Sequence, residues 1–160
     1  MHDRVLFEQT TSTLELAVVS RETQVDHEIE HEWLGSKRKL RLRGVYQVRA
    51  GFDLRRPFHV RIDGHRVSVE LPPPRILGVD QVSVEVLSFA NGLWNKFNPE
   101  AVVEETGNLP LLARRKASEA GLQKEALDRF TEQLREKFGP RYDVEVHVST
   151  GQTAIAEPRE

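Results

Sequence analysis

The chain has 160 residues, the length of one domain, and its 38% hydrophobic and 30% charged content is typical of a globular protein with a highly charged surface. It has no cysteine, which excludes disulfides, thiol catalysis and cysteine-ligated metals and leaves the compartment open. No uncharged apolar run approaches the roughly 18 residues of a membrane span, and residues 1–4 lack the apolar region of a secretory signal.

The net charge of −2 hides a strong segregation of charge along the chain. Residues 1–36 carry eight acidic and two basic side chains, whereas residues 37–75 carry eleven basic and three acidic ones. A basic block can bind nucleic acid or anionic lipid. We instead expect the acidic and basic blocks to form adjacent strands that neutralise each other, and we predict no nucleic-acid partner.

Residues 1–12 are predicted to form an arm or a short helix, followed by a single α+β domain at residues 13–149. An apolar, β-branched strand near residues 14–20 runs into a hairpin in which charged and apolar side chains alternate. A two-residue loop at Gly35-Ser36 puts glycine first, as a type II′ turn requires. The resulting register places opposite one another Glu30 and Arg41, Ile29 and Leu42, and Val25 and Tyr46.

A second register of this hairpin, with Leu34-Gly35 as the loop, also pairs opposite charges. It requires an unfavourable backbone conformation at Leu34 and places Val25 opposite Gly44, so we expect the first register. A second hairpin is predicted around Asp63-Gly64, with Val60 opposite Val67.

The prolines at 72–74 end that hairpin, and a further strand is expected at residues 82–86, reaching as far as residue 89. Pro99 then suits the first position of a helix, which the run 107–110 is expected to interrupt or end. A longer helical stretch is predicted from about residue 111 to residue 138, followed by a strand at 142–149 and a disordered tail at 150–160.

The order of these elements predicts an α+β fold. We expect a mainly antiparallel twisted sheet built from hairpins, with the C-terminal helices packed on one face and a final strand after them.

No pattern in the chain indicates catalysis or metal binding. His27 and His31 share a strand face but lie roughly 13 Å apart along it, too far to share one ion. No nucleophile-elbow serine and no phosphate-binding glycine loop occurs. We therefore assign no catalytic residue, no cofactor and no metal, and we expect a non-enzymatic protein; a hydrolase is kept as an alternative.

The aromatic segment 89–97 is the candidate binding surface, through Phe89, Trp94 and Phe97. Exposed aromatic side chains in a loop could anchor a protein partner or a second copy of the chain. The competing structural interpretation is that Phe97 packs as a hydrophobic staple at the start of the helix, with Trp94 beneath it.

Two runs, residues 44–54 and 67–77, resemble the signature of the bacterial domain-of-unknown-function 4230 family. The family has a strand with a glycine, a Gly-x-Asp-Leu corner, and a hairpin ending in Leu-Pro before an isoleucine. The residues at the matching positions are Gly44, Gly51, Asp53, Leu54, Leu71, Pro72, Pro74 and Ile76. The helical segment and the closing strand also match, although the break expected at 107–110 departs from a more continuously helical family pattern.

The resemblance implies a bacterial protein held near a membrane by an N-terminal anchor, in an extracytoplasmic location, with no known activity or cofactor. This chain lacks the anchor, so it is either soluble or a shortened form of a longer protein. From the residues themselves, we expect Gly44 to mark a bulge or a close backbone approach and Asp53 to hydrogen-bond main-chain N–H groups at a corner. The expected function is a binding or assembly module of the cell envelope; the alternative is a ligand-binding domain with an apolar pocket between sheet and helix.

Overall fold

The computed structural model describes residues 15–90 and 99–150. Within these ranges the elements, in chain order, are β1 (Glu15–Trp33), β2 (Ser36–Asp53), β3 (His59–Asp63), β4 (Arg66–Leu71), β5 (Arg75–Ala90), α1 (Pro99–Glu119), α2 (Leu122–Phe138) and β6 (Asp143–Val148). The predicted arm at 1–12 and the predicted tail beyond residue 150 lie outside the described residues. The predicted α+β class, with helices after the hairpins and a final strand, is confirmed.

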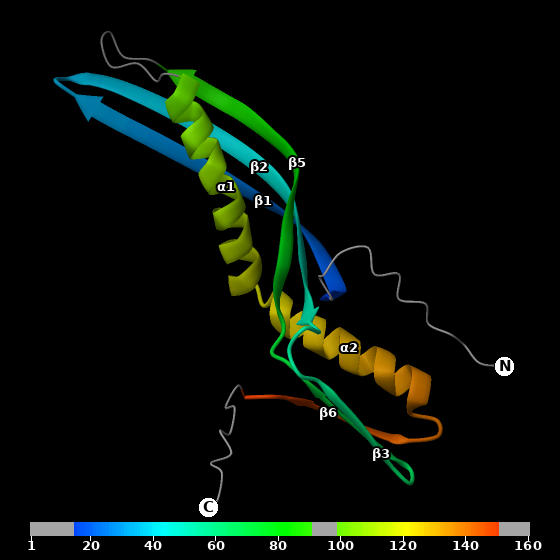
Figure 1. The fold of residues 1–160 in the computed structure, drawn as a ribbon. Coiled ribbons are helices and arrows are strands. Elements are labelled where there is room, and N and C mark those ends of the chain that lie inside the picture. Colours follow the sequence, from blue (N-terminus) through cyan, green and yellow to red (C-terminus); the bar gives the residue numbers. More distant parts are fainter. Residues whose placement is uncertain (1–14, 91–98, 151–160) are drawn as a thin grey trace, which may run out of the picture.

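The strands form two sheets (Figure 1). The long sheet has the antiparallel order β1-β2-β5, and α1 lies against one of its faces. The second sheet has the order β3-β4-β6, in which β3 and β4 are antiparallel but β4 and β6 are parallel. The predicted final strand, β6, is therefore an outer strand of the second sheet, paired in parallel with β4.

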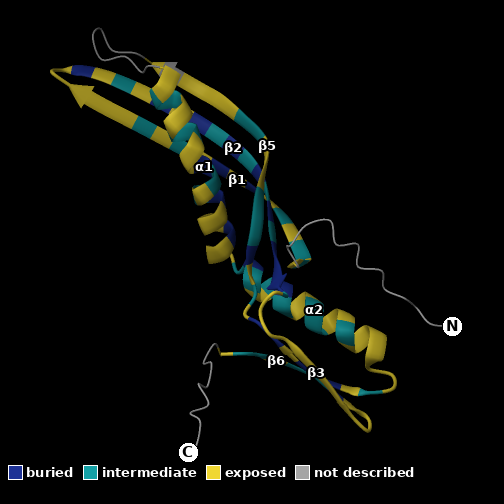
Figure 2. Ribbon diagram, viewed as in Figure 1, coloured by how far each residue is buried: buried dark blue, intermediate teal, exposed yellow. Residues whose placement is uncertain are grey.

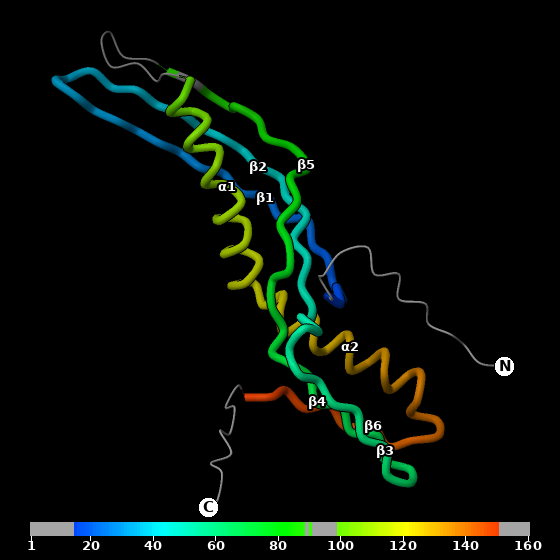
Figure 3. The backbone as a smooth tube through the Cα atoms, in the orientation of Figure 1, coloured from blue at the N-terminus to red at the C-terminus, as the bar shows by residue number. Residues whose placement is uncertain are grey.

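Regular bulges bend the long sheet. The pairing of β5 with β2 skips Leu77, Val82 and Leu87, one residue in every five. Each bulge increases the local twist of a strand and bends it. The resulting curved path of β5 is visible in Figure 3.

The register of the first hairpin differs from the expected one by two residues. Leu34 and Gly35 form the loop with φ of 46° and 72°, the positive values of a type I′ turn. Glu30 consequently lies opposite Lys39, and Val25 lies opposite Gly44. The expected register was wrong because a positive φ at Leu34 costs only about 1–2 kcal/mol, which the packing of the paired strands offsets.

A two-residue shift keeps every side chain on its predicted face, so the expected neutralisation of charge is confirmed. On the face away from α1, ion pairs join four basic side chains of β2 to the directly opposite acidic side chains of β1. They are Lys37 with Glu32 at 3.5 Å, Lys39 with Glu30 at 3.2 Å, Arg41 with Glu28 at 3.2 Å, and Arg43 with Asp26 at 2.8 Å.

The register of the second hairpin is also shifted by two residues. Its loop is Gly64-His65, with φ of 57° at Gly64, and Val60 lies opposite Val69. Glycine thus occupies the first central position, where a positive φ is required. The shifted register adds a pair of opposite charges, Asp63 and Arg66, to the end of the hairpin.

The helix break lies at Gly121, not at residues 107–110. Gly121 adopts a left-handed φ of 79° between α1 and α2. Pro110 lies inside α1 and removes one main-chain hydrogen bond there. The helix continues because Leu109, Ala113 and Ala117 are buried against the long sheet, where tertiary packing outweighs the local proline signal.

Two hydrophobic clusters stabilise the fold, and β2 and α2 contribute to both. The larger cluster lies between the long sheet and the helices, whereas the smaller one lies between the second sheet and α2. Ala126 of α2 belongs to the larger cluster, while Phe130 packs against the smaller one. Figure 2 shows burial concentrated in the central strand β2, in contrast to the exposed strand β3.

Candidate binding site on the second sheet

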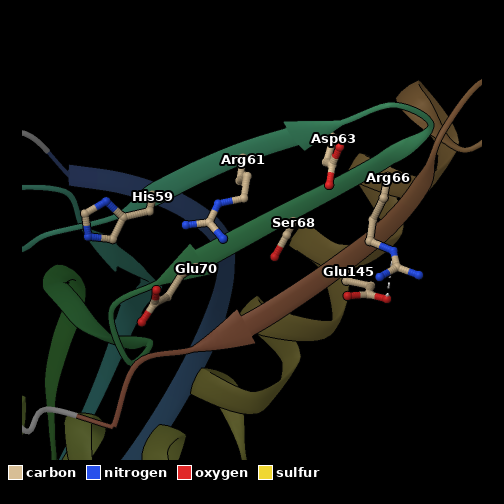
Figure 4. A pocket seen from close by; sticks show the side chains of 7 residues that line it. All are labelled: His59, Arg61, Asp63, Arg66, Ser68, Glu70 and Glu145. Atoms are coloured by element: carbon tan, nitrogen blue, oxygen red, sulfur yellow. Dashed lines mark ion pairs between the residues drawn. The ribbon is translucent and has the colours of Figure 1, made fainter.

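The second sheet has one polar face and one apolar face, because side chains alternate along β3 and β4. The polar face is an open hollow of about 530 Å³ (Figure 4). It is lined by His59, Arg61, Asp63, Arg66, Ser68, Glu70 and Glu145. The opposite face forms an apolar groove of about 340 Å³. Each face is a candidate site.

The polar face lacks the geometry of a catalytic centre. Its ion pair joins Arg66 Nε to Glu145 Oε1 at 3.6 Å. Ser68 makes no hydrogen bond to His59 or to any other described side chain, so no nucleophile–base pair is assembled. Figure 4 shows the seven side chains spread along three strands rather than converging on one point.

The apolar groove lies between β3 and α2; we call it the β3–α2 groove. It is lined by Leu16, Leu54, Phe58, Val60, Ile62, Val67, Val69, Leu71, Phe130, Leu134, Phe138 and Tyr142. Side chains of α2 bury the apolar residues of β4, but those of β3 stay open. Val60 is 57% exposed and Ile62 is 66% exposed. The groove is therefore a half-covered apolar surface with a strand along its open side.

Within the described chain, β3 has a free edge, since it pairs only with β4. Its five residues pair without a bulge, so its outer main-chain N–H and C=O groups form a regular row. The edge of β5 is interrupted by its three bulges. In contrast to β5, β3 offers regular main-chain groups directly beside an apolar groove.

The other outer strand of the long sheet, β1, is tied to the helices. His27 Nε2 lies 3.3 Å from Glu105 Oε2, and Lys116 Nζ donates to the carbonyl oxygen of Gln24 at 2.7 Å. Arg21 and Glu125 add an ion pair between β1 and α2. These contacts fix β1 in place and leave it less accessible to a further strand than β3.

A corner centred on Asp53 connects the long sheet to the groove. Its side chain is only 5% exposed. Asp53 Oδ1 accepts a hydrogen bond from the main-chain N–H of Arg55 at 3.1 Å, the type of bond expected from the sequence. The Arg55 guanidinium donates to both carboxylate oxygens at 2.8 Å, and Arg75 Nη1 donates at 3.4 Å. The hydrogen bonds from the Arg55 side chain are the main reason that the pKa of Asp53 falls to about 2.

Most residues of the sequence signature lie at this corner and at the base of the groove. Leu54 and Leu71 line the groove, and Pro72 is fully buried after the end of β4. A Cβ atom at Gly51 would overlap the carbonyl oxygen of Leu16, so the close backbone approach requires glycine there. Gly44 lies apart, in the long sheet, under the ring of Tyr46.

The family model described as "Protein of unknown function (DUF4230)" matches residues 8–148, most of the chain. The chain belongs to this family. No curated protein and no solved structure matches it. The predicted family is thus confirmed, and the DUF4230 match assigns no activity, partner or compartment.

Two residues of the predicted aromatic site of this DUF4230 chain, Trp94 and Phe97, lie outside the described residues. Only the main chain of Phe89 is described, in β5 opposite Leu40. Its role in binding therefore stays a prediction. The alternative expected from the sequence, an apolar pocket between sheet and helix, agrees in kind with the β3–α2 groove, but sequence reasoning did not identify the residues that line it. The available signal was the alternating apolar face of the second hairpin, which includes Val60.

Neither a metal cluster nor a membrane-spanning helix is found in the described part of the DUF4230 chain. No three or more metal-ligating side chains gather there, and His27 faces α1, where it contacts Glu105. Neither described helix is sufficiently long and apolar to cross a bilayer.

Proposed function

We propose that this DUF4230 domain is a non-enzymatic binding module whose protein partner docks in the β3–α2 groove. The observation that carries the proposal is the uncovered apolar face of β3, with Val60 and Ile62 mostly exposed beside a free strand edge. Contiguous exposed apolar patches on soluble domains commonly mark interaction sites. A free strand edge adds a row of main-chain donors and acceptors to such a patch.

The chemistry of the groove supports binding rather than catalysis. Its lining contains no carboxylate, imidazole or amine, and Tyr142 brings its sole polar side chain. General acid–base catalysis needs a titratable group within hydrogen-bond reach of the reacting atom. A hydrolase would have to use the polar face, where Ser68 has no base bonded to it.

The proposal includes an envelope location near a membrane, as the resemblance to the family implies. Fractionation of the producing bacterium, with the domain detected by antibody, tests this part of the proposal. We expect the domain in envelope fractions; recovery only with cytosolic markers would contradict the location but not the binding site.

An apolar small-molecule or lipid ligand is the second candidate. The groove volume of about 340 Å³ falls within the range of roughly 300–1,000 Å³ that is typical of ligand sites. Such sites normally also contain a few polar groups that orient the ligand. The scarcity of polar groups in this lining, together with the open strand edge, favours the protein partner.

Site-specific photo-crosslinking tests the proposal in the cells that make the protein. A photoreactive phenylalanine analogue would replace Ile62, in the groove, and in a control variant Lys124, whose side chain is 80% exposed on α2. We expect a discrete protein adduct from position 62 and none from position 124. An adduct with a lipid or small molecule would support the second candidate. No adduct specific to position 62 would contradict the proposal.

A further inference from the structure

The kind of partner follows from the position of the groove beside the β3 edge. An extended segment that pairs with β3 would bond to its free N–H and C=O groups while placing alternate side chains in the groove. An acyl chain could fill the same groove but would leave those main-chain groups without protein partners. The arrangement therefore favours a β-strand as the occupant; this inference rests on the proposed function.

Pairing geometry determines which side chains of the added strand enter the groove. Directly opposite residues of paired strands lie on the same face of a sheet. Residues opposite Val60 and Ile62 would therefore enter the apolar groove. The residue between them, opposite Arg61, would lie on the polar face, where Arg61 projects (Figure 4).

The charge of Arg61 is available to such a strand. The residue directly opposite Arg61 is the neutral Ser68 of β4, and Arg61 makes no ion pair with any described residue. The adjacent cross-strand pairs each combine a basic or imidazole side chain with a carboxylate: Asp63 lies opposite Arg66, and His59 opposite Glu70. Arg61 is thus a charged residue of β3 that faces a neutral side chain on β4, and an added strand could supply the opposite charge there.

We propose that the partner is a strand with an apolar–acidic–apolar triplet, added to the free edge of β3. The two apolar side chains lie in the β3–α2 groove opposite Val60 and Ile62. The acidic side chain pairs with Arg61 on the polar face. The apolar contacts and main-chain hydrogen bonds supply most of the affinity, and the charge pair selects the sequence.

Fluorescence anisotropy with two labelled peptides tests the proposal. The peptides are Val-Thr-Val-Glu-Val-Thr-Val and the same sequence with lysine at the centre; both read the same in either direction, so strand orientation does not matter. We expect wild-type protein to prefer the glutamate peptide by about threefold to fivefold, the range that an exposed ion pair supports. Arg61→Glu should reverse the preference, whereas the control Arg129→Glu, on α2 beside Glu132, should leave it unchanged.

Further variants separate strand addition from simple apolar contact. N-methylation of alternate peptide residues should abolish binding for the set whose N–H groups face β3 and not for the other set. Ile62→Asn should weaken both peptides, because Ile62 is exposed and the variant is expected to fold. Circular dichroism verifies the fold of each variant.

Three results would overturn the inference: no binding of either peptide, equal binding of both, or no reversal by Arg61→Glu. None of these results decides the proposed function, since a protein adduct at position 62 would still support a groove partner of another sequence. The absence of an adduct at position 62, by contrast, would remove the proposed function itself.

Discussion

Asp53 holds the corner between the two sheets by an almost buried network of charge-assisted hydrogen bonds. Such bonds are stronger than bonds between neutral groups, and one partner left alone in a buried site is costly. The sequence predicted the corner and its main-chain bond. It could not predict Arg55 and Arg75 as the partners, because several arginines lie within reach along the chain.

This network makes stability depend on acid pH. The pKa of Asp53 is about 2 in the folded protein, below the ordinary value of 3.8. The carboxylate therefore stabilises the fold above pH 3.8, and this contribution is lost as the pH falls towards 2. Asp53→Asn should lower the urea midpoint at pH 7 and flatten its fall between pH 4 and pH 2. Urea titrations followed by circular dichroism measure both effects. Asp128→Asn, at an exposed pair with Lys124, is the control; a wild-type pH profile in Asp53→Asn would refute the assignment.

Gly44 is required by the ring of Tyr46, not by the backbone conformation. A Cβ atom at Gly44 would overlap this ring, which is buried over it. Gly44→Ala should therefore destabilise the protein by about 1–3 kcal/mol, the usual cost of overpacking. In a Tyr46→Leu background the same change should cost less, and a double-mutant cycle in urea measures the difference. Equal costs in both backgrounds would contradict this explanation.

At the scale of elements, the sequence predicted the strands, their faces and the helical stripe, but not the registers. Alternating charges fit two registers equally well, because a shift of two residues preserves both the faces and the charge pairing. The choice depends on the turn at Leu34-Gly35 and on the packing of the long sheet, neither of which periodicity reports. Likewise, Pro110 was expected to break a helix that the long sheet stabilises by burial of Leu109.

A double-mutant cycle distinguishes the two registers of the first hairpin. Arg41 Nε lies 3.2 Å from Glu28 and is not paired with Glu30. We expect a coupling of about 0.5 kcal/mol between Glu28 and Arg41, which is typical of an exposed pair, and a smaller one between Glu30 and Arg41. Substitutions to glutamine, singly and together, with stability measured at low salt, give both couplings. The reverse order of couplings would restore the register that the sequence favoured.

The turn of this hairpin offers a route to greater stability. Leu34 has φ of 46° and is 74% exposed, so it has backbone strain without burial to offset it. Leu34→Asn creates the Asn-Gly pair that type I′ turns favour and should stabilise the protein by about 0.5–1 kcal/mol. Thermal unfolding measures the gain. Leu34→Val should destabilise the protein, because a β-branched residue is poorly suited to this conformation. If Leu34→Asn instead destabilises the hairpin, the exposed leucine makes a stabilising contact that outweighs its backbone strain.

At the scale of the molecule, the candidate site arises where the second sheet is only half covered. Length and element order predicted one α+β domain, but not that the strands would divide into two sheets. That division depends on the corner at Asp53 and on the parallel pairing of β6 with β4, a contact between distant segments. The apolar groove follows from it, since α2 covers β4 but not β3. Local periodicity cannot indicate which apolar faces remain uncovered.

The half-covered sheet should also be the less stable part of the molecule. Phe130 of α2 packs against Phe52 of β2, with ring centroids 5.3 Å apart and planes tilted by 58°, and this contact joins the helix to the junction between the sheets. Phe130→Ala should cost about 3 kcal/mol through lost packing. Because the long sheet retains its own larger cluster with α1, hydrogen exchange should show amides of β4 and β6 losing protection before those of β2 near Leu42. Leu111→Ala, at an exposed position of α1, is the control and should change neither the stability nor the protection of either sheet. If protection falls equally in both sheets, the two clusters unfold as one unit, and β3 lies on a scaffold as rigid as the long sheet.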